Sequence, residues 1–550
     1  MLLNNVTLQG RSVDLADARD HKGANVVTLL MGNNGSGKSR LFQTICSAFI
    51  QVPRQNMMNH YLRDVVNLSN LEQLDSLSYM QDGDFNLLSH CREPFFKRYM
   101  VGNDAFFDLF STYPYDQAII NHKHNVDDIN GIKSLISHFL EEAKSHANNI
   151  KLEKNGISST ELKIPNKVLA VTGSPYDKFP FRDTYSNQDS LSPYVYLGTR
   201  GKRQAGARFN RGYLSYKFDQ LGSSFIKLLL KPRQEYFDFT KMFNFLNISS
   251  SFTLKLCLSE RIRTEEINEK SILDVVRSVK FFKDKDHEFI NEESERDDLS
   301  KRLVDALNYV AGDRLDKHRS HFEPLELLCK IDLAKEPEDK KYLSSLDLLS
   351  EYDLVELEDV VFSKSKSKQE FLLSQASSGE LSLLFTMSSI AGEIEDGSLI
   401  LIDEPEISLH PEWQLNFLSL LTDIFSSYKC CHFIIATHSP NIISSIPDDN
   451  AYIVSMDADD TKLMPSRLYH NRSADFQLAR VFNAPGNSNE YLIKTAINIF
   501  SKVRKYKVFD EKDVEGFNFL NDLRNNIPKD DSVIELIEML NEVYQKYGRN

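Results

Sequence analysis

The sequence predicts an α/β fold with a large helical insertion and a helical C-terminal extension. An apolar, β-branched run leads into the glycine-rich stretch GNNGSGKS, Gly32–Ser39, and a helical pattern follows it. Two later apolar runs, 399–403 and 431–436, are typical of buried strands in a parallel sheet. Most of the remaining chain is helical in pattern, including the part after about residue 470. These three observations predict a sheet built from segments that lie far apart in the chain.

The composition excludes several classes of protein. The chain has 550 residues, which gives room for about two to four domains, and its 41% hydrophobic and 26% charged residues are ordinary for a soluble globular protein. No apolar run is long enough for a membrane span and the N-terminus lacks a signal peptide's basic and apolar regions, so we expect a cytoplasmic protein. The six cysteines form no CxxC pair, which argues against a zinc site. The net charge of −14 argues against nonspecific coating of nucleic acid.

The patterns divide the chain into six segments. Two further strand-like runs, NKVLAVTGSP and SPYVYLGTRG, belong with the sheet. The expected segments are the N-terminal half of the sheet with the glycine-rich loop (1–60), a helical insertion (61–160), the central strands (161–201), a mainly helical lobe (202–370), the C-terminal half of the sheet (371–470) and a helical C-terminal region that binds a partner (471–550).

The glycine-rich stretch matches the phosphate-loop pattern at every fixed position. Glycines let successive backbone N–H groups approach phosphate oxygens, and the following helix N-terminus favours an anion. Lys38 supplies a point charge to the β- and γ-phosphates, and the Ser39 hydroxyl can ligate Mg²⁺. The residues expected to bind ATP here are Gly32, Asn33, Asn34, Gly35, Ser36, Gly37, Lys38, Ser39 and Arg40.

Two carboxylates end the apolar run LILID. A carboxylate at the carboxyl end of a parallel strand lies where nucleotide sites form. Asp403 is expected to hold Mg²⁺, and Glu404 to orient or deprotonate the attacking water. Alone, an apolar run followed by Asp-Glu is a weak signal, and the upstream phosphate loop strengthens it.

Two more short motifs have both a structural and a functional interpretation. Ser377, Ser378, Gly379 and Glu380 stand before a helix, where they form either a simple N-cap or an anion site. His438 follows a buried strand directly. It is either a core histidine or a group that touches the γ-phosphate and reports its presence.

The order of these motifs resembles the ABC-type ATPase superfamily. The phosphate loop, the Ser-Gly-Glu signature, the strand ending in Asp-Glu and the Thr-His-Ser strand follow the layout of that superfamily, and DEPEISLHPEWQ and ATHSP are similar to its SMC-like and OLD-like branch. The resemblance implies an ABC-type P-loop ATPase head that uses ATP and Mg²⁺, with Glu404 and His438 as catalytic residues.

The same resemblance implies a homodimer with two ATP molecules between two heads, or a higher oligomer built from such dimers. Ser377 and Gly379 match the signature that contacts ATP bound to the second subunit, and Ser408–His410 matches the loop that meets the partner there. Ser378 departs from the Leu-Ser-Gly-Gly-Gln pattern, and no glutamine-bearing loop stands out after a central strand.

A closer resemblance is carried by VLAVTGSPYDKFP and YVYLGTRG in a chain with a helical C-terminal extension. These stretches look like the PtuA-type ATPases of Septu and retron-linked Septu anti-phage systems. The resemblance implies a separate, PtuB-like HNH nuclease as partner and, in retron versions, a reverse transcriptase with its RNA-linked DNA. The stretch Asp457-Ala-Asp459-Asp460 lies too soon after His438 for an appended nuclease domain, and it is interpreted as a hairpin turn.

A basic island extends from Arg200 to Arg233, with nine basic residues and only Asp219 as an acid. Four aromatic residues lie among these basic ones and could stack on bases: Phe209, Tyr213, Tyr216 and Phe225. The island is therefore either a nucleic-acid surface or a basic surface with another partner. That partner would be the acidic run Asp284–Asp298 or the ATP phosphates across the dimer.

Three functions stay open at this point. The first is an ATPase that controls a partner nuclease, and the second is a scaffold that holds ATP with little turnover. The third is a DNA-repair ATPase of the SMC or RecF kind that binds DNA directly. A transporter ATPase is disfavoured because the sequence contains no membrane segment.

Overall fold

The computed structural model describes most of the chain. The described residues are 1–17, 23–57, 73–90, 95–101, 105–111, 119–122, 135–140, 150–159, 161–181, 192–200, 213–259, 262, 267–276, 293–312, 325–457 and 461–548. Within them, no helix combines the length and the apolar character needed to cross a lipid bilayer.

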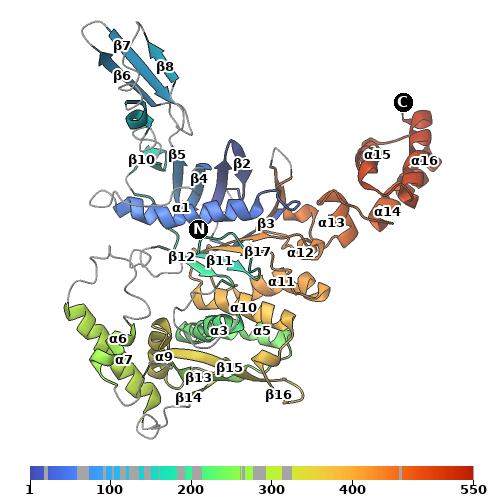
Figure 1. Ribbon diagram of the computed structural model, residues 1–550. Helices are drawn as coiled ribbons and strands as arrows, with labels where there is room; N and C mark the ends of the chain where they lie inside the picture. Colours follow the sequence, from blue (N-terminus) through green and yellow to red (C-terminus); the bar gives the residue numbers. More distant parts are fainter. Residues whose placement is uncertain are drawn as a thin grey trace.

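A seven-stranded sheet forms the centre of the molecule (Figure 1). Its strand order is β12-β11-β17-β18-β3-β19-β20, and every neighbouring pair is parallel except the last. The strands are β3 (Val26–Met31), β11 (Val168–Thr172), β12 (Tyr194–Leu197), β17 (Leu399–Asp403), β18 (His432–Ala436), β19 (Ala451–Ser455) and β20 (Leu463–Pro465). The runs that the sequence predicted as strands therefore meet in one sheet, as the predicted α/β fold requires.

Helices cover both faces of this sheet, which explains why its central strands are buried throughout and mostly apolar. On one face, Leu399 and Leu401 of β17 pack in one cluster with residues of α1 (Lys38–Met57). On the other face, Ile400 and Ile402 share a cluster with α3 (Tyr213–Leu230), α10 (Ser378–Glu393) and α11 (Pro411–Ile424). Figure 1 shows α1 on one side of the central strands and α10 and α11 on the other.

A second, antiparallel sheet lies beyond α1, in the order β10-β9-β5-β4-β1-β2. Its strands are β1 (Leu2–Leu8), β2 (Arg11–Asp14), β4 (Leu74–Gln81), β5 (Asp84–His90), β9 (Ile150–Lys154) and β10 (Ile157–Ser158). A three-stranded sheet of β6 (Phe95–Val101), β7 (Ala105–Ser111) and β8 (Ile119–His122) follows β5.

These strands correct the expectation that residues 61–160 are helical. Residues Leu74–Gln81 alternate between buried and less buried positions, and Asp82-Gly83 connects β4 to β5 with positive φ angles of 50° and 82°. This dipeptide is a strong hairpin signal, and the period-two pattern beside it is that of a strand. The two consecutive polar residues Asp75 and Ser76 interrupt the alternation, and the sequence analysis therefore interpreted this segment as helical.

The lobe after the basic island combines helices with a sheet that the sequence did not predict. The sheet order is β14-β13-β15-β16, formed by β13 (Ser251–Leu258), β14 (Glu326–Asp332), β15 (Val355–Ser363) and β16 (Glu370–Leu372). The helices are α3, α4 (Arg233–Asp238), α5 (Thr240–Phe245), α6 (Glu269–Val276), α7 (Glu293–Ala311) and α9 (Lys340–Glu351). The lobe predicted to be mainly helical, 202–370, is therefore mixed α/β in its described part, and the helical insertion predicted at 61–160 consists mostly of strands in its described residues.

The chain ends in a helical unit with its own core. It consists of α13 (Ala474–Arg480), α14 (Glu490–Tyr506), α15 (Glu511–Asp522) and α16 (Ser532–Tyr547), which follow α12 (Pro440–Ser444) and the β19–β20 hairpin. Figure 1 shows α14–α16 standing away from the central sheet. The predicted helical C-terminal extension is present.

A buried histidine ties three segments of the sheet region together. His432 Nδ1 accepts a hydrogen bond from Leu3 N at 3.1 Å, and Nε2 lies 2.9 Å from Thr28 Oγ1. Because the Thr28 hydroxyl donates to Leu15 O, the Nε2 proton of His432 points to Thr28 and the ring is neutral. Burial, reinforced by the N-terminal ammonium, lowers the pKa of His432 to about 3.

This histidine predicts a loss of stability in mild acid. The unfolded chain binds a proton below pH ~6.5 whereas the folded ring stays neutral, so wild type should lose about 2 kcal/mol at this residue between pH 7 and pH 5. Urea unfolding at both pH values measures the effect, and His432→Gln should show a correspondingly smaller drop. His410→Gln, at an exposed position, is the matched control. An equal drop in wild type and His432→Gln would contradict the prediction.

Candidate functional site

The register of the parallel strands brings the predicted site residues to one edge of the sheet. Asp403 at the end of β17 lies opposite Ala436 on β18, and Ala436 lies opposite Leu30 on β3. The segments that leave these three strands therefore start side by side. Lys38 follows β3, Glu404 follows β17 and His438 follows β18. A crevice at the carboxyl ends of parallel strands is the usual ligand position in such sheets.

The phosphate loop connects β3 to α1 and is closed around Lys38. Gly35 and Gly37 have φ angles of +88° and +101°, which glycine adopts without strain. The residue Lys38 is 5% exposed, and its ammonium donates to Gly32 O at 2.7 Å. Burial lowers the pKa of Lys38, while Asp403, Asp457 and two glutamates oppose that shift. Asn34 and Arg40, also predicted to bind ATP, are exposed beside it.

Ser39 and Asp403 form a pair of oxygen ligands that fits Mg²⁺. The Ser39 hydroxyl hydrogen-bonds the Asp403 carboxylate, which is 6% exposed. Among the described residues, Asp403 Oδ1 is a buried oxygen without a hydrogen-bond partner. Burial, with the nearby charge of Glu404, raises the pKa of Asp403 to about 7. A hard divalent cation would satisfy the orphaned oxygen and hold the carboxylate ionised, and Mg²⁺ takes such a carboxylate together with phosphate oxygens.

Glu404 and His438 lie close together just after the ends of β17 and β18. His438 Nε2 lies 4.0 Å from Glu404 Oε1, and both side chains are about one third exposed, at 31% and 37%. Glu404 has a φ of +52°, which is uncommon for a residue with a Cβ, and its N–H donates to Ala436 O. With its side chain 31% exposed, His438 is not a core histidine. The histidine that is buried in the core is His432. Burial and the Lys38 charge lower the pKa of His438.

Glu406 orients the segment that carries His438, and the sequence analysis missed it. Its carboxylate accepts hydrogen bonds from His438 N at 2.6 Å and from Thr437 Oγ1 at 2.8 Å. Burial raises the pKa of Glu406. Gln414 supports the same segment, because its Oε1 accepts from Ser439 Oγ at 2.7 Å. The second glutamate of DEPE and the glutamine of HPEWQ were the only signals in the sequence.

The Ser-Gly-Glu signature begins α10 on the opposite face of the sheet from α1 (Figure 1). Ser377 is the N-cap, and it forms a capping box with Glu380. A Cβ on Gly379 would lie 3.0 Å from Ser408 O, so only glycine fits without movement of this loop. Ser377, Ser378 and Ser408 are exposed together on this surface.

The described residues directly after β11, the strand that neighbours β17, contain no glutamine, and Gln188 lies outside the described part of the chain. Thr172 at the end of β11 lies opposite Asp403, and the segment 172–181 that follows contains an aspartate, Asp177, instead. Asp177 accepts from Tyr196 Oη at 2.8 Å and from Arg200 at 2.6 Å. The described segment after β11 therefore presents an acidic side chain beside the strand that ends in Asp403.

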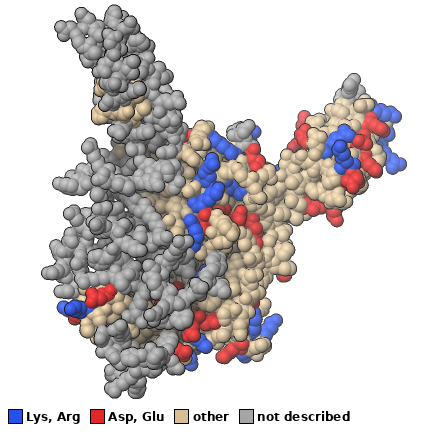
Figure 2. All heavy atoms as spheres, in the orientation of Figure 1, with Lys and Arg blue, Asp and Glu red and all other residues tan. Residues whose placement is uncertain are grey.

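The described part of the basic island is largely paired within the chain. Arg200 pairs with Asp177, Lys227 with Glu393 at 2.5 Å, and Lys231 donates to Ile394 O. Figure 2 shows basic and acidic side chains interspersed on the described part of this face. The island residues Lys202, Arg203, Arg208, Phe209 and Arg211, and most of the acidic run, lie outside the described residues, as do the side chains of Tyr213 and Tyr216.

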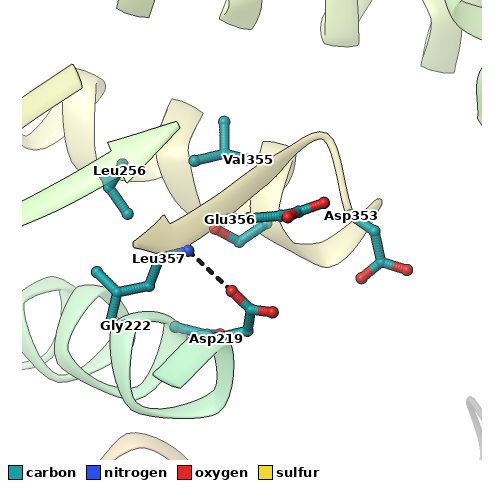
Figure 3. Close-up of a pocket in the computed structure, with 9 residues that line it drawn as sticks. Asp219, Gly222, Leu256, Asp353, Val355, Glu356 and Leu357 are labelled. Atoms are coloured by element: carbon teal, nitrogen blue, oxygen red, sulfur yellow. Dashed lines mark hydrogen bonds between the residues drawn. The ribbon is translucent and has the colours of Figure 1, made fainter. Parts of the chain in front are cut away.

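A separate pocket lies between α3 and β15, away from these strand ends (Figure 3). Asp219 accepts a hydrogen bond from Leu357 N at 2.8 Å across it, and Leu256 and Val355 line it. The carboxylate joins the helix to the strand, so the pocket is part of the packing of this lobe.

Comparison with known proteins identifies a family and several distant relatives. The family described as "AAA domain, putative AbiEii toxin, Type IV TA system" matches residues 168–444. Protein ea59 of Escherichia phage lambda is 30% identical over 159 residues, 27% of this chain and 29% of that protein. The retron Ec83 probable ATPase of Escherichia coli is 32% identical over 91 residues, 14% and 16% of the two chains. The retron Vc95 probable ATPase of Vibrio cholerae serotype O1 biovar El Tor is 25% identical over 144 residues, 24% and 27% of the two.

The matches cover less than a third of each of these three relatives. Among solved structures, the Smc head bound to the C-winged helix domain of ScpA aligns over 84% of this chain and 97% of that chain, with 11% identity and a TM-score of 0.27. The SMC head domain from Thermotoga maritima aligns over 84% and 99%, with 11% identity and a TM-score of 0.24.

Proposed function

This chain belongs to the AbiEii-type AAA-domain family, and we propose that it is an ABC-type ATPase of the SMC-like kind whose nucleotide-dependent dimer controls a partner. The observation that carries the proposal is the meeting of Lys38, Asp403, Glu404 and His438 at one edge of the central sheet. Two curated relatives that are named as probable retron ATPases support it.

Each residue has a distinct role in the proposed reaction. The backbone N–H groups of the phosphate loop and the Lys38 ammonium bind the phosphates of ATP. Ser39 and Asp403 would hold Mg²⁺, which would supply positive charge to the phosphates. Glu404 orients the attacking water and accepts its proton, while His438 donates a hydrogen bond to the γ-phosphate. Glu406 keeps the His438 backbone in place through its two hydrogen bonds.

A second copy of the chain completes the site in this proposal. Ser377 and Ser378 are exposed at the N-terminus of α10, where a helix favours an anion. Their helix lies on the opposite face of the sheet from α1, so the signature of one subunit is free to contact ATP on the loop of another. ATP binding would close two heads and hydrolysis would open them, because the contacts of the γ-phosphate exist only in the closed state.

The proposed partner is a separate HNH nuclease, as in PtuA-type ATPases of Septu and retron-linked Septu, with a reverse transcriptase and its RNA-linked DNA in retron versions. The two central strands β11 and β12 and the helical unit α13–α16 correspond to the stretches that suggested this subfamily. Helices α14–α16 lie away from the central sheet and have a hydrophobic core of their own, which supports a partner-binding role for residues 471–548. A DNA-repair ATPase and an ATP-holding scaffold are the competing proposals.

Affinity purification from the native host tests the partner. We expect an HNH nuclease to co-purify with the full chain, identified by mass spectrometry, with any bound nucleic acid sequenced in parallel. A Lys38→Ala bait serves as the nucleotide-deficient control. DNA-repair proteins in place of a nuclease would overturn the defence proposal. The ATP hydrolysis rate of the purified protein, measured with and without DNA, separates an ATPase that controls a nuclease from a scaffold that only holds ATP. Stimulation of hydrolysis by DNA favours the ATPase, and no detectable hydrolysis favours the scaffold.

A further inference from the structure

A pocket opens between α14 and α16 in the helical unit at the end of the chain. Its volume is about 390 Å³, within the range of pockets that bind small ligands. Phe500 and Val503 of α14 and Val543 and Tyr547 of α16 supply its apolar lining. The two helices are neighbours in the unit and lie away from the central sheet (Figure 1). The pocket is therefore separate from the candidate nucleotide site.

The apolar lining continues along the two helices beyond the pocket. Ile497 lies three residues before Phe500, and Met539 lies four residues before Val543, so the members of each pair share a helix face. Ile497 and Met539 are each 48% exposed. Exposed apolar side chains that adjoin an apolar pocket form a continuous surface, and such surfaces mark interaction sites. We refer to the pocket and this extension as the α14–α16 groove.

One end of the α14–α16 groove is basic. The stretch 491–509 contains five basic residues and no acidic residue. Lys494 and Lys502 form ion pairs with neighbouring carboxylates. Arg504 and Lys507 instead line the pocket, both are exposed, and neither forms an ion pair with another described residue. Two cations at the pocket therefore have no anionic partner in the part of the chain that the structure describes.

The charges around the pocket favour an anionic occupant. Cations near the end of a helix interact well with its dipole, which accounts for Arg504 in the last turn of α14 but not for an apolar pocket beside it. The described residues that line the pocket include no carboxylate. Glu542 follows Glu538 by one turn, and because Glu538 pairs with Arg524 at 2.6 Å, Glu542 lies on the Arg524 side of α16. An occupant with carboxylates would meet two cations without a competing acid from the lining.

The shape of the groove favours a peptide over a nucleic acid. Proteins that bind single-stranded nucleic acid combine a long basic track with aromatic platforms for successive bases. Here two cations border one end of an apolar groove between two helices. Such a groove accepts the apolar face of an amphipathic segment, while charges at its rim select the partner.

We propose that the α14–α16 groove binds an acidic segment of a partner protein, which places a large apolar side chain in the pocket and carboxylates against Arg504 and Lys507. This inference rests on the proposed function, in which residues 471–548 bind a partner. It adds the place and the chemistry of that contact.

Methyl NMR of the full chain with an unlabelled peptide tests the groove. The probe is Glu-Glu-Leu-Phe-Glu-Glu with blocked ends, which carries both apolar anchors and carboxylates. We expect it to shift the methyl signals of Val503 and Val543 saturably and to leave those of Val454, in the central sheet, unchanged. Arg504→Glu should raise the half-saturating peptide concentration by about tenfold, because an attractive charge becomes a repulsive one. Lys512→Glu, the same charge reversal at an exposed position of α15, should titrate like wild type.

Each of four results would overturn the proposal. The first is that the Val503 and Val543 signals do not move at millimolar peptide. The second is equal titration of wild type and Arg504→Glu, and the third is equally strong binding of the basic peptide Lys-Lys-Leu-Phe-Lys-Lys. The fourth is a single-stranded oligo-dT that shifts these signals when the acidic peptide does not, which would assign the groove to nucleic acid.

The fate of this proposal is separable from that of the proposed function. Arg504→Glu should bind Mg²⁺–ATP like wild type, because the groove lies away from the phosphate loop. If the peptide fails to bind while an HNH nuclease still co-purifies with the chain, the groove proposal alone falls. If the peptide binds and no nuclease co-purifies, the nuclease proposal falls and the groove stands.

Discussion

Lys38→Ala is expected to weaken binding of Mg²⁺–ATP by about a hundredfold or more, which corresponds to roughly 3 kcal/mol. Lys38 is buried at the centre of the phosphate loop, and its ammonium donates to Gly32 O. A nucleotide would replace this neutral acceptor with phosphate oxygens, and charge-assisted hydrogen bonds of that kind are the strong ones. Alanine offers neither the charge nor the donors.

Calorimetric titration of the full chain measures the loss, and thermal unfolding without nucleotide shows whether the variant is folded. Lys512→Ala, at an exposed position of α15, is the matched control and should bind like wild type. Unchanged affinity in Lys38→Ala would place the nucleotide elsewhere in the molecule and would refute the proposed site.

Glu404→Gln is expected to lower the hydrolysis rate by about 10²–10⁴-fold while leaving ATP binding nearly unchanged. Glutamine retains the shape of the side chain but cannot accept a proton from water. Because the closed dimer is proposed to open only after hydrolysis, the variant should accumulate as an ATP-dependent dimer. Light scattering after size-exclusion chromatography, with and without Mg²⁺–ATP, measures this.

The opposite behaviour of two variants makes the dimer test decisive. Lys38→Ala should remain in its ligand-free oligomeric state when ATP is added, whereas Glu404→Gln should form the larger species. Glu412→Gln, in the exposed first turn of α11, controls for loss of a glutamate near the same loop. If the Lys38 and Glu404 variants show the same oligomer with ATP, the sandwich mechanism is wrong for this protein.

The parts of the site that the sequence predicted are those encoded by local patterns. The phosphate loop has fixed glycine, lysine and serine positions, and Asp403 and Glu404 end an apolar run that could only be a buried strand. The strand register then brings these segments together, as the carboxyl ends of parallel strands require.

The parts that the sequence did not predict depend on contacts between distant segments. Glu406 is one of several carboxylates in its stretch, and only the fold shows that it binds the backbone of His438. Asp457 was correctly placed in a hairpin, but its carboxylate accepts a hydrogen bond from the N–H of Asn33, which lies 424 residues earlier. Strands such as β4 and β14 were missed because their sequences hide the period of two; in β14 the exposed Leu328 lies between the buried Leu327 and Cys329.

The position of β3 has a consequence for how the protein is made. This strand, which leads into the phosphate loop, is hydrogen-bonded on one side to β18 and on the other to β19, both about 400 residues later in the chain. At about 5–20 residues per second, a ribosome needs roughly 20–80 s to add that length. Until then β3 has neither neighbour, and such non-local pairing is slow to form. The nascent chain therefore assembles the sheet around its candidate nucleotide site only after β18 and β19 have been made.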